Sequence, residues 1–433
     1  KSGMRRILLL VFAVLGAVLL AALAVIAVQF WHDPGPEQGS VPVADAAQQV
    51  RHGEYLARAG DCIGCHTARG GAAYAGGRGI RTPFGDLYAP NITPDRQTGI
   101  GDWNADDFWR AMHHGRSRDG SFLYPAFPYP NYTLVTRADA DALFAYLRSL
   151  PPVRRPNQEH ELRFPYNQRL LLGLWRALYF RPGTYQPDPE QSAAWNRGAY
   201  LVQGLGHCNA CHANRNVLGA TETGAGLAGG LIPILNWYAP SLASDREFGV
   251  GDWPPEELAR LLKTGVSAHG AVFGPMAEVV RQSLQHLTDS DIAAMVDYLK
   301  ARPPSGEQAP VTRRASGEDP VAMLRLGSAL YEKHCEQCHK IAGTGAPPDY
   351  PPLADNRSLT TPSAINPIRI VLNGGYPPST AGNPRPFGMP PFGQLLDDRE
   401  VAAVVTYIRN SWGNSAPQVS PNEVRLYRTV PLD

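Results

Sequence analysis

The sequence lacks an excess of charge of either sign, and it lacks the signatures of phosphate-binding and hydrolytic enzymes. Its 433 residues include 40 Lys and Arg and 39 Asp and Glu, for a formal net charge of +1. A nearly neutral chain does not attract a polyphosphate backbone, so we expect no nucleic-acid partner. It has no P-loop pattern and no recognisable nucleophile–base pair. A G-x-G-x-x-G match at residues 224–229 follows no apolar strand run, so we interpret it as a loop.

Cysteine is scarce as well, and none of the six cysteines stands outside one pattern, Cys-x-x-Cys-His. This pattern attaches c-type haem: both thiols form thioethers with the haem vinyl groups, and the histidine ligates the iron. Two intervening residues let one helical turn present both sulfurs. No second pair follows at the roughly 15–20 residues of a zinc ribbon, and the βαβ context of a thioredoxin-like motif is absent. The sequence therefore predicts three covalently bound haem c groups, at site 1 (Cys62, Cys65, His66), site 2 (Cys208, Cys211, His212) and site 3 (Cys335, Cys338, His339).

Methionine is the usual sixth iron ligand in such proteins, and the chain has only six methionines. Met276, in Gly-Pro-Met, and Met389, in Met-Pro-Pro-Phe, lie in irregular segments ahead of predicted helices. A methionine ligand raises the reduction potential of a haem. We therefore predict that Met276 ligates iron at site 2 and that Met389 does so at site 3. Met295 and Met323 have the pattern of packing residues.

Site 1 departs from this arrangement. The position that corresponds to Met276 is Phe127, in Tyr-Pro-Ala-Phe-Pro-Tyr, and phenylalanine cannot ligate iron. The nearest donors are Met112, His113 and His114, at the end of a predicted helix. We take bis-histidine ligation through His113 as the first expectation. Met112, His114 and an iron without a sixth protein ligand remain open alternatives.

The first thirty residues set the expected compartment. From Ile7 to Phe30 the chain is uncharged and almost wholly apolar, after Lys1, Arg5 and Arg6. At about 1.5 Å per residue this run makes a helix of about 36 Å, longer than the roughly 30 Å hydrocarbon core of a bilayer. The preceding positive charge predicts a cytoplasmic N-terminus. We expect an uncleaved, single-pass anchor in the bacterial inner membrane, with the haem domains in the periplasm; the alternative is a signal peptide, whose apolar core usually has about 7–15 residues.

The chain repeats itself around each motif, which predicts its domains. A Gly-containing helix precedes each motif, and an amphipathic helix with apolar residues at i, i+3, i+4 and i+7 closes each unit. Glycine and proline together make about a fifth of the chain and predict many turns and little sheet. We predict a mostly α fold with three tandem class I-like cytochrome c domains. The predicted segments are a transmembrane anchor (1–30), stalk (31–48), domain 1 (49–150), connector with an apolar helix (151–192), domain 2 (193–301), linker (302–320) and domain 3 (321–433).

The connector contains an apolar stretch from Leu170 to Arg181 that is too short to span a bilayer. Such a helix can lie at the membrane interface with its basic residues towards the headgroups, or it can pack between domains. Both interpretations stay open from the sequence. If it lies at the membrane, electrons are expected to leave the protein near it.

The three motifs, in this order, resemble the triheme cytochrome c subunit of bacterial membrane-bound dehydrogenases. Shared segments are Tyr-Ala-Pro at 88–90 and 238–240, Gly-Asp-Trp at 101–103 and 251–253, Tyr-Pro-Ala-x-Pro-Tyr at 124–129, Gly-Pro-Met-Ala-Glu-Val-Val at 274–280 and Met-Pro-Pro-Phe at 389–392. The resemblance covers essentially the whole chain after the stalk. It implies that this chain is an electron-transfer subunit. Its partner, a catalytic subunit of molybdenum, quinoprotein or flavin type, would oxidise an aldehyde, alcohol or sugar. The haems then pass electrons to ubiquinone or a terminal oxidase.

Two features depart from the resemblance, and two other functions compete with it. Phe127 stands where many relatives carry methionine, and the long N-terminal span implies a different anchoring from that of relatives held by surface helices. A free-standing membrane cytochrome between a quinol-oxidising complex and an oxidase would carry the same motifs. A haem enzyme acting at an open site 1 would also fit. The substrate lies in the partner, so this sequence does not name it.

Overall fold

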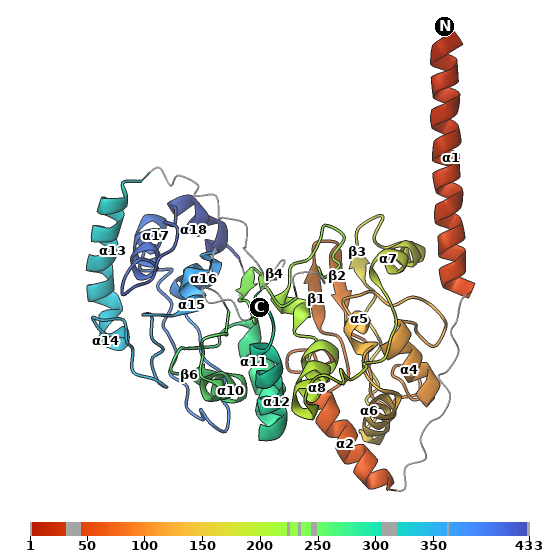
Figure 1. Cartoon of the computed structure of the whole chain (residues 1–433), viewed down its shortest axis with the longest axis horizontal. Helices are drawn as coiled ribbons and strands as arrows, with labels where there is room; N and C mark the ends of the chain where they lie inside the picture. Colours follow the sequence, from red (N-terminus) through yellow and green to blue (C-terminus); the bar gives the residue numbers. More distant parts are fainter. Residues whose placement is uncertain are drawn as a thin grey trace. The chain divides into compact units, whose positions relative to one another are not determined.

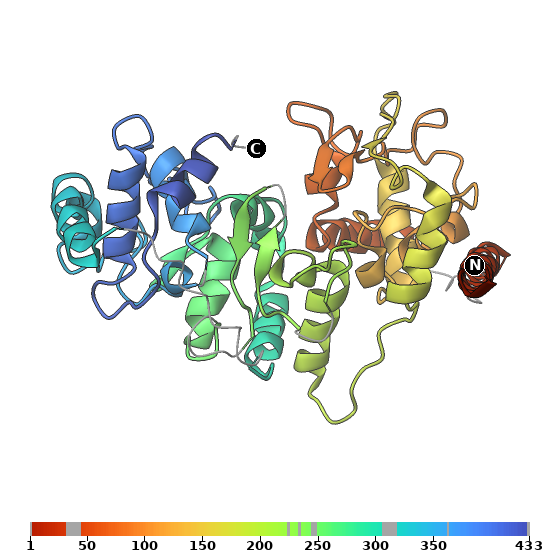
Figure 2. The same cartoon turned by 90° about the horizontal axis from the view of Figure 1, so that it is seen from above.

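The computed structural model describes residues 2–31, 45–222, 226–232, 235–243, 249–304, 318–361 and 363–430. Most of the predicted stalk and linker, and Gly224 of the glycine-rich match, lie outside these residues. The chain forms two compact units (Figure 1 and Figure 2). Unit 1 comprises residues 1–56 and 65–186, and unit 2 comprises residues 57–64 and 187–433.

Unit 1 is mainly helical with one small sheet. The antiparallel sheet has the order β1-β2-β3, with strands Gly79–Thr82, Gly85–Tyr88 and Glu161–Leu162. Its helices are α1 (Ser2–Trp31), α2 (Ala46–Ala59), α3 (Cys62–His66), α4 (Ala105–His114), α5 (Tyr129–Tyr132), α6 (Arg137–Ser149), η1 (Arg169–Leu171) and α7 (Leu172–Tyr179); α2 and α3 run across the boundary with unit 2.

Unit 2 is likewise helical, with two short hairpins. The hairpins pair β4 (Gly230–Ile232) with β5 (Trp237–Ala239) and β6 (Val266–Ser267) with β7 (Gly270–Ala271). The helices are α8 (Ala193–Tyr200), η2 (Leu201–Leu205), α9 (Asn209–His212), α10 (Pro255–Thr264), α11 (Pro275–Gln282), η3 (Leu284–His286), α12 (Asp289–Lys300), α13 (Pro320–His334), α14 (Glu336–His339), α15 (Arg357–Thr360), α16 (Ile365–Asn373), α17 (Asp398–Ile408) and α18 (Pro421–Arg428). The prediction of many turns and little sheet is confirmed.

One helix pair occurs three times: α2 with α6, α8 with α12, and α13 with α17. A glycine lies at each crossing, and a Cβ placed there would overlap the backbone of the second helix. At Gly53, Gly198 and Gly327 this Cβ would lie 1.9, 1.9 and 2.2 Å from the carbonyl oxygens of Ala142, Ala294 and Ala403. Since real atoms never approach so closely, only glycine permits this packing.

The closing helices of these pairs match their prediction. Their i, i+3, i+4, i+7 faces are buried except for the half-buried Phe144. Thr136 and Thr288 cap α6 and α12, as predicted, because each side chain accepts a hydrogen bond from the backbone N–H three residues on. The buried face consists of Ala140, Leu143 and Leu147 in α6, Ile292, Met295, Val296 and Leu299 in α12, and Val401, Val404, Val405 and Ile408 in α17.

Within unit 1, the end of α1 contacts α7. The rings of Phe30 and Phe122 lie 4.8 Å apart, and the backbone of Gly173 in α7 packs beside Ile26. Helix α1 is long and apolar enough to cross a membrane, by length and composition alone. The connector helix is therefore next to the candidate membrane span.

Candidate haem-binding sites

Each Cys-x-x-Cys-His motif forms a single helical turn, as its spacing predicts. Helix α3 carries site 1, and α9 and α14, with the cysteine that precedes each of them, carry sites 2 and 3. The His212 N–H donates to the Cys208 carbonyl at 2.9 Å, and the His339 N–H donates to the Cys335 carbonyl at 3.0 Å. No disulfide joins any of the six cysteines. Both sulfurs of each motif thus lie on one turn.

A proline carbonyl orients each motif histidine. The Nδ1 atoms of His66, His212 and His339 lie 2.8, 2.7 and 3.0 Å from the carbonyl oxygens of Pro90, Pro240 and Pro351. A carbonyl can only accept, so Nδ1 carries the proton and Nε2 keeps the lone pair that a metal needs. Burial also lowers the pKa of all three imidazoles, which favours the neutral, ligating form.

These prolines explain one of the sequence repeats. Pro90 and Pro240 end the recurring Tyr-Ala-Pro segments, so the repeat holds the orienting carbonyl for sites 1 and 2. The Gly-Asp-Trp repeat has a related cause. Carbonyls in it accept hydrogen bonds from a cation of the closing helix, Arg148 in unit 1 and Lys300 in unit 2. Sequence reasoning noted both repeats without their function, and it missed Pro351, which lies in no such segment.

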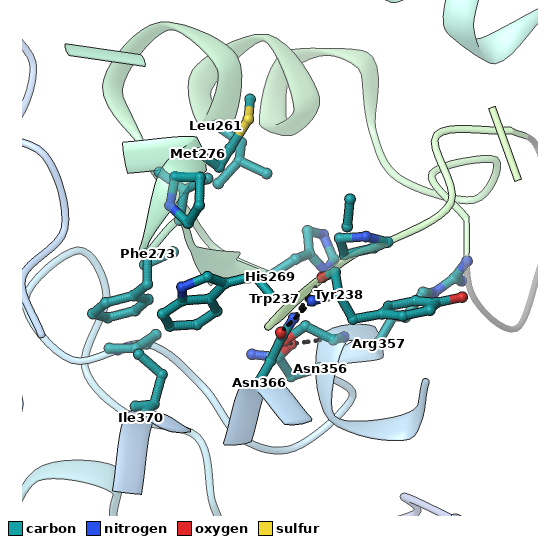
Figure 3. A pocket seen from close by; sticks show the side chains of 18 of the residues that line it. Trp237, Tyr238, Leu261, His269, Phe273, Met276, Asn356, Arg357, Asn366 and Ile370 are labelled. Atoms are coloured by element: carbon teal, nitrogen blue, oxygen red, sulfur yellow. Dashed lines mark hydrogen bonds between the residues drawn. The ribbon is translucent and has the colours of Figure 1, made fainter. Parts of the chain in front are cut away.

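Sites 2 and 3 share one apolar cavity of about 440 Å³ in unit 2 (Figure 3). His212 and His339 both line it, together with the cysteines of both motifs. Met276, in the first turn of α11, and Met389, whose backbone pairs with Gly375, also line it. The structure thus brings each predicted methionine to the same cavity as its predicted partner histidine.

Residues of β5 and α16 hold the two halves of this cavity together. The Asn366 side chain accepts from the Tyr238 N–H at 2.9 Å and donates to the Tyr238 carbonyl at 2.7 Å. The guanidinium of Arg369 stacks 4.8 Å from the centre of the Trp237 ring. Figure 3 shows Trp237 and Phe273 next to Ile370, with Asn366 pointing to Tyr238. The strand directly before Pro240, whose carbonyl orients His212, is therefore fixed to the helix that lines site 3.

The donors around the motifs do not form a zinc site, which usually has four ligands. Within the described residues, no three His, Cys, Asp or Glu side chains gather into a possible metal cluster. Two thiols and one neutral imidazole on a turn, beside an apolar cavity with a thioether on its wall, fit haem c.

At site 1 the structure places the candidate sixth ligands in the last turn of α4. Met112, His113 and His114 are all buried. His113 stacks on Trp109 with 4.3 Å between ring centres and hydrogen bonds to the Thr133 backbone, and its Nδ1 has no partner among the described residues. Burial lowers the pKa of His113 to about 4. The backbone carbonyl of His114 accepts from Arg176 of α7.

Comparisons with known proteins agree with these sites. The cytochrome c family model matches residues 50–151 and 324–412, and the model of subunit III of cbb3-type cytochrome c oxidase matches residues 193–299. The gluconate 2-dehydrogenase cytochrome c subunit of Pantoea cypripedii is 40% identical over 384 residues, which are 85% of this chain and 86% of the relative. This chain belongs to the family of dehydrogenase cytochrome c subunits.

Two further members of the family cover similar lengths. The cytochrome c subunit of quinone alcohol dehydrogenase from Gluconobacter oxydans is 38% identical over 436 residues, 96% of this chain and 88% of its own. The fructose dehydrogenase cytochrome subunit of Gluconobacter japonicus is 36% identical over 422 residues, 90% and 86% of the two chains. In this chain, each of the three segments that match a family model contains one Cys-x-x-Cys-His turn.

Proposed function

We propose that this cytochrome c subunit carries three haem c groups and relays electrons from a periplasmic dehydrogenase subunit to ubiquinone in the membrane. The observation that supports it best is the shared cavity in unit 2. Two motif histidines, two cysteine pairs and two methionines line one apolar space. Two redox centres held in a common cavity can exchange electrons without a mobile carrier between them.

The side chains have distinct roles in this proposal. The six cysteines fix the haem edges, and His66, His212 and His339 ligate iron through Nε2. Met276 and Met389 supply the sixth ligands of sites 2 and 3, and a thioether ligand favours the reduced state and so a higher potential. Each bound haem supplies reversible one-electron transfer at its iron. The apolar walls exclude water from the sites in unit 2, and Pro240 and Pro351 hold the histidines in the ligating tautomer.

The partner and the membrane complete the proposal. Relatives are named as cytochrome subunits of gluconate, alcohol and fructose dehydrogenases, so a catalytic subunit of molybdenum, quinoprotein or flavin type is the proposed electron donor. Helix α1 is proposed as a single-pass anchor in the bacterial inner membrane, with Arg5 and Arg6 in its first turns on the cytoplasmic side. The cytochrome would then lie in the periplasm beside its quinone acceptor.

The test is purification of the chain from native membranes in mild detergent. We expect a stoichiometric catalytic subunit to copurify, identified with its cofactor by mass spectrometry, and three haems per chain by absorbance of the pyridine complex. The substrate of that subunit should then reduce the haem bands anaerobically, and added ubiquinone should reoxidise them. A chain that copurifies with a quinol-oxidising complex, or whose haems are not reduced by any subunit bound to it, would refute the relay.

A further inference from the structure

At all three sites, one helix that follows the haem motif ends at a glycine with positive φ. Helices α4, α10 and α16 are followed by Gly115, Gly265 and Gly374, whose φ angles are +57°, +82° and +65°. Left-handed φ values favour glycine at a helix end, so these residues mark equivalent positions. Counting back from each glycine therefore gives the equivalent residues of the three helices.

At sites 2 and 3 the same three positions of this helix line the cavity. They are the third, fourth and seventh residues before the glycine, which is one face of a helix. The residue two positions before the glycine does not line the cavity in either helix: Lys263 pairs with Asp289 at 3.0 Å, and Leu372 packs in the core around α17. The lining residues are Leu258, Leu261 and Leu262 in α10, and Pro367, Ile370 and Val371 in α16.

In α4 the lining positions are Phe108, Ala111 and Met112. Met112 is the one residue of this face with an iron-binding atom, and its side chain is 5% exposed. His113 occupies the position of Lys263 and Leu372, off this face. Its stacking on Trp109 and its bond to Thr133 agree with that direction.

The backbone also shows that Phe127 occupies the position of the methionine ligand. In unit 2 the Gly265 carbonyl accepts from the Val272 N–H at 2.9 Å, and Met276 follows four residues later. In unit 1 the Gly115 carbonyl accepts from the Leu123 N–H at 2.9 Å, and Phe127 follows four residues later. The usual loop thus brings no donor to site 1.

The residue beside Met112 is smaller than its counterpart in unit 2. Figure 3 shows Leu261 next to the Met276 side chain in unit 2. The residue at the position of Leu261 in α4 is Ala111, whose methyl group is three carbons smaller. A small residue at this position restricts the adjacent Met112 side chain less than leucine would.

We propose that the thioether sulfur of Met112, rather than His113, is the sixth ligand at site 1. The proposal rests on the function proposed above, because it needs a haem attached at Cys62, Cys65 and His66. Site 1 is then a histidine–methionine centre whose methionine comes from helix α4 instead of the following loop. Its potential stays in the high range that thioether ligation gives, not the lower range of bis-histidine ligation.

The test uses the full-length cytochrome with its bound haems. Met112→Leu places at site 1 the residue found at this position in α10. We expect the ferric sulfur-to-iron absorption band to lose about one third of its intensity, since one of the three haems loses its methionine ligand. After reduction, carbon monoxide should bind one haem per chain in the variant and none in the wild type. The matched control is Met323→Leu, a fully buried methionine of the core around α17, which should leave both measurements unchanged.

His113→Leu separates the competing assignments. If His113 is the ligand, this variant gains carbon monoxide binding, while Met112→Leu keeps the wild-type spectrum; either result overturns the proposal. Carbon monoxide binding by wild-type protein would show an open iron and overturn it as well. Haem counting distinguishes these failures from failure of the proposed function: a chain with only two haems lacks the site itself, whereas three haems with a different ligand refute Met112 alone.

Discussion

Single glycines determine how closely the paired helices pack. In an isolated helix, Gly→Ala stabilises by about 1 kcal/mol because alanine loses less backbone entropy. At Gly327 the new Cβ would lie 2.2 Å from the Ala403 oxygen and 2.7 Å from Cβ of Tyr407, so the helices must move apart. We expect Gly327→Ala to lower the free energy of unfolding by about 1–3 kcal/mol. Guanidinium unfolding of the holoprotein, followed at the haem absorbance, measures this change.

The control for this effect is Gly183→Ala. A Cβ at Gly183 would have no atom within 4 Å, and its backbone does not need glycine. The free energy of unfolding should therefore stay the same or rise slightly. If Gly327→Ala stabilised the protein as an unconstrained helical site would, the close packing of α13 on α17 would be refuted.

How far individual residues could be predicted from the sequence depended on whether their chemistry is local. The cysteines and histidines of the motifs were predicted because one helical turn carries the whole attachment chemistry. Pro351 was not, because it acts through its backbone carbonyl, which every residue has. The sequence could not decide between His113 and Met112 as the ligand. Adjacent residues face different sides of a helix, and the position of each relative to α10 and α16 is known only once the end of α4 is known.

At the scale of elements, two hydrogen bonds between Asn366 and Tyr238 join β5 to α16 and so connect sites 2 and 3. Asn366→Leu keeps the side-chain volume similar but removes both hydrogen bonds to the Tyr238 backbone. The two hydrogen bonds are part-buried, so the penalty lies at the low end of that for an unsatisfied buried polar group, and we expect the free energy of unfolding of unit 2 to fall by about 1 kcal/mol. Differential scanning calorimetry of the holoprotein should show this as a lower midpoint for the transition of unit 2.

Asn422→Leu serves as the comparison, because Asn422 is exposed near the start of α18 and makes no contact with the cavity. It should leave the midpoint within error. A midpoint equally insensitive to Asn366→Leu would show that the two hydrogen bonds do not hold β5 to α16.

Helices were predicted better than the contacts between them. The closing helices have complete apolar faces and side-chain caps, Thr136, Thr288 and Asp397, so local sequence determines them. The apolar stretch of the connector is instead a short 3-10 turn followed by α7. Its Arg176 is buried against Phe122 and Tyr129, an arrangement that depends on residues far away in the chain. The shared cavity also forms through contacts between residues far apart in the sequence, and no sequence pattern shows that two repeats face one another.

For the molecule as a whole, η1 and α7 together offer an apolar surface next to the candidate membrane span. The side chains of Leu170 and Leu178 are 59% and 64% exposed, while α7 itself contacts the end of α1. Trp175, by contrast, packs near Tyr129 and Tyr179, so the leucines are the better test of this surface. Moving exposed leucines beside a membrane span into the lipid interface is favourable by about 25 cal/mol for each Å² of apolar area removed from water.

We therefore predict that Leu170→Asp combined with Leu178→Asp slows ubiquinone reduction several-fold in native membranes, because charged side chains keep α7 out of the interface. Reduction of a soluble dye by the same complex should be unchanged, since the catalytic subunit and the haems are intact. Val217→Asp with Leu218→Asp is the matched control, with residues of unit 2 that are 92% and 42% exposed. Unchanged quinone kinetics in the α7 variant would place the site of electron exit elsewhere, and equal losses in both variants would point to a general effect of added charge.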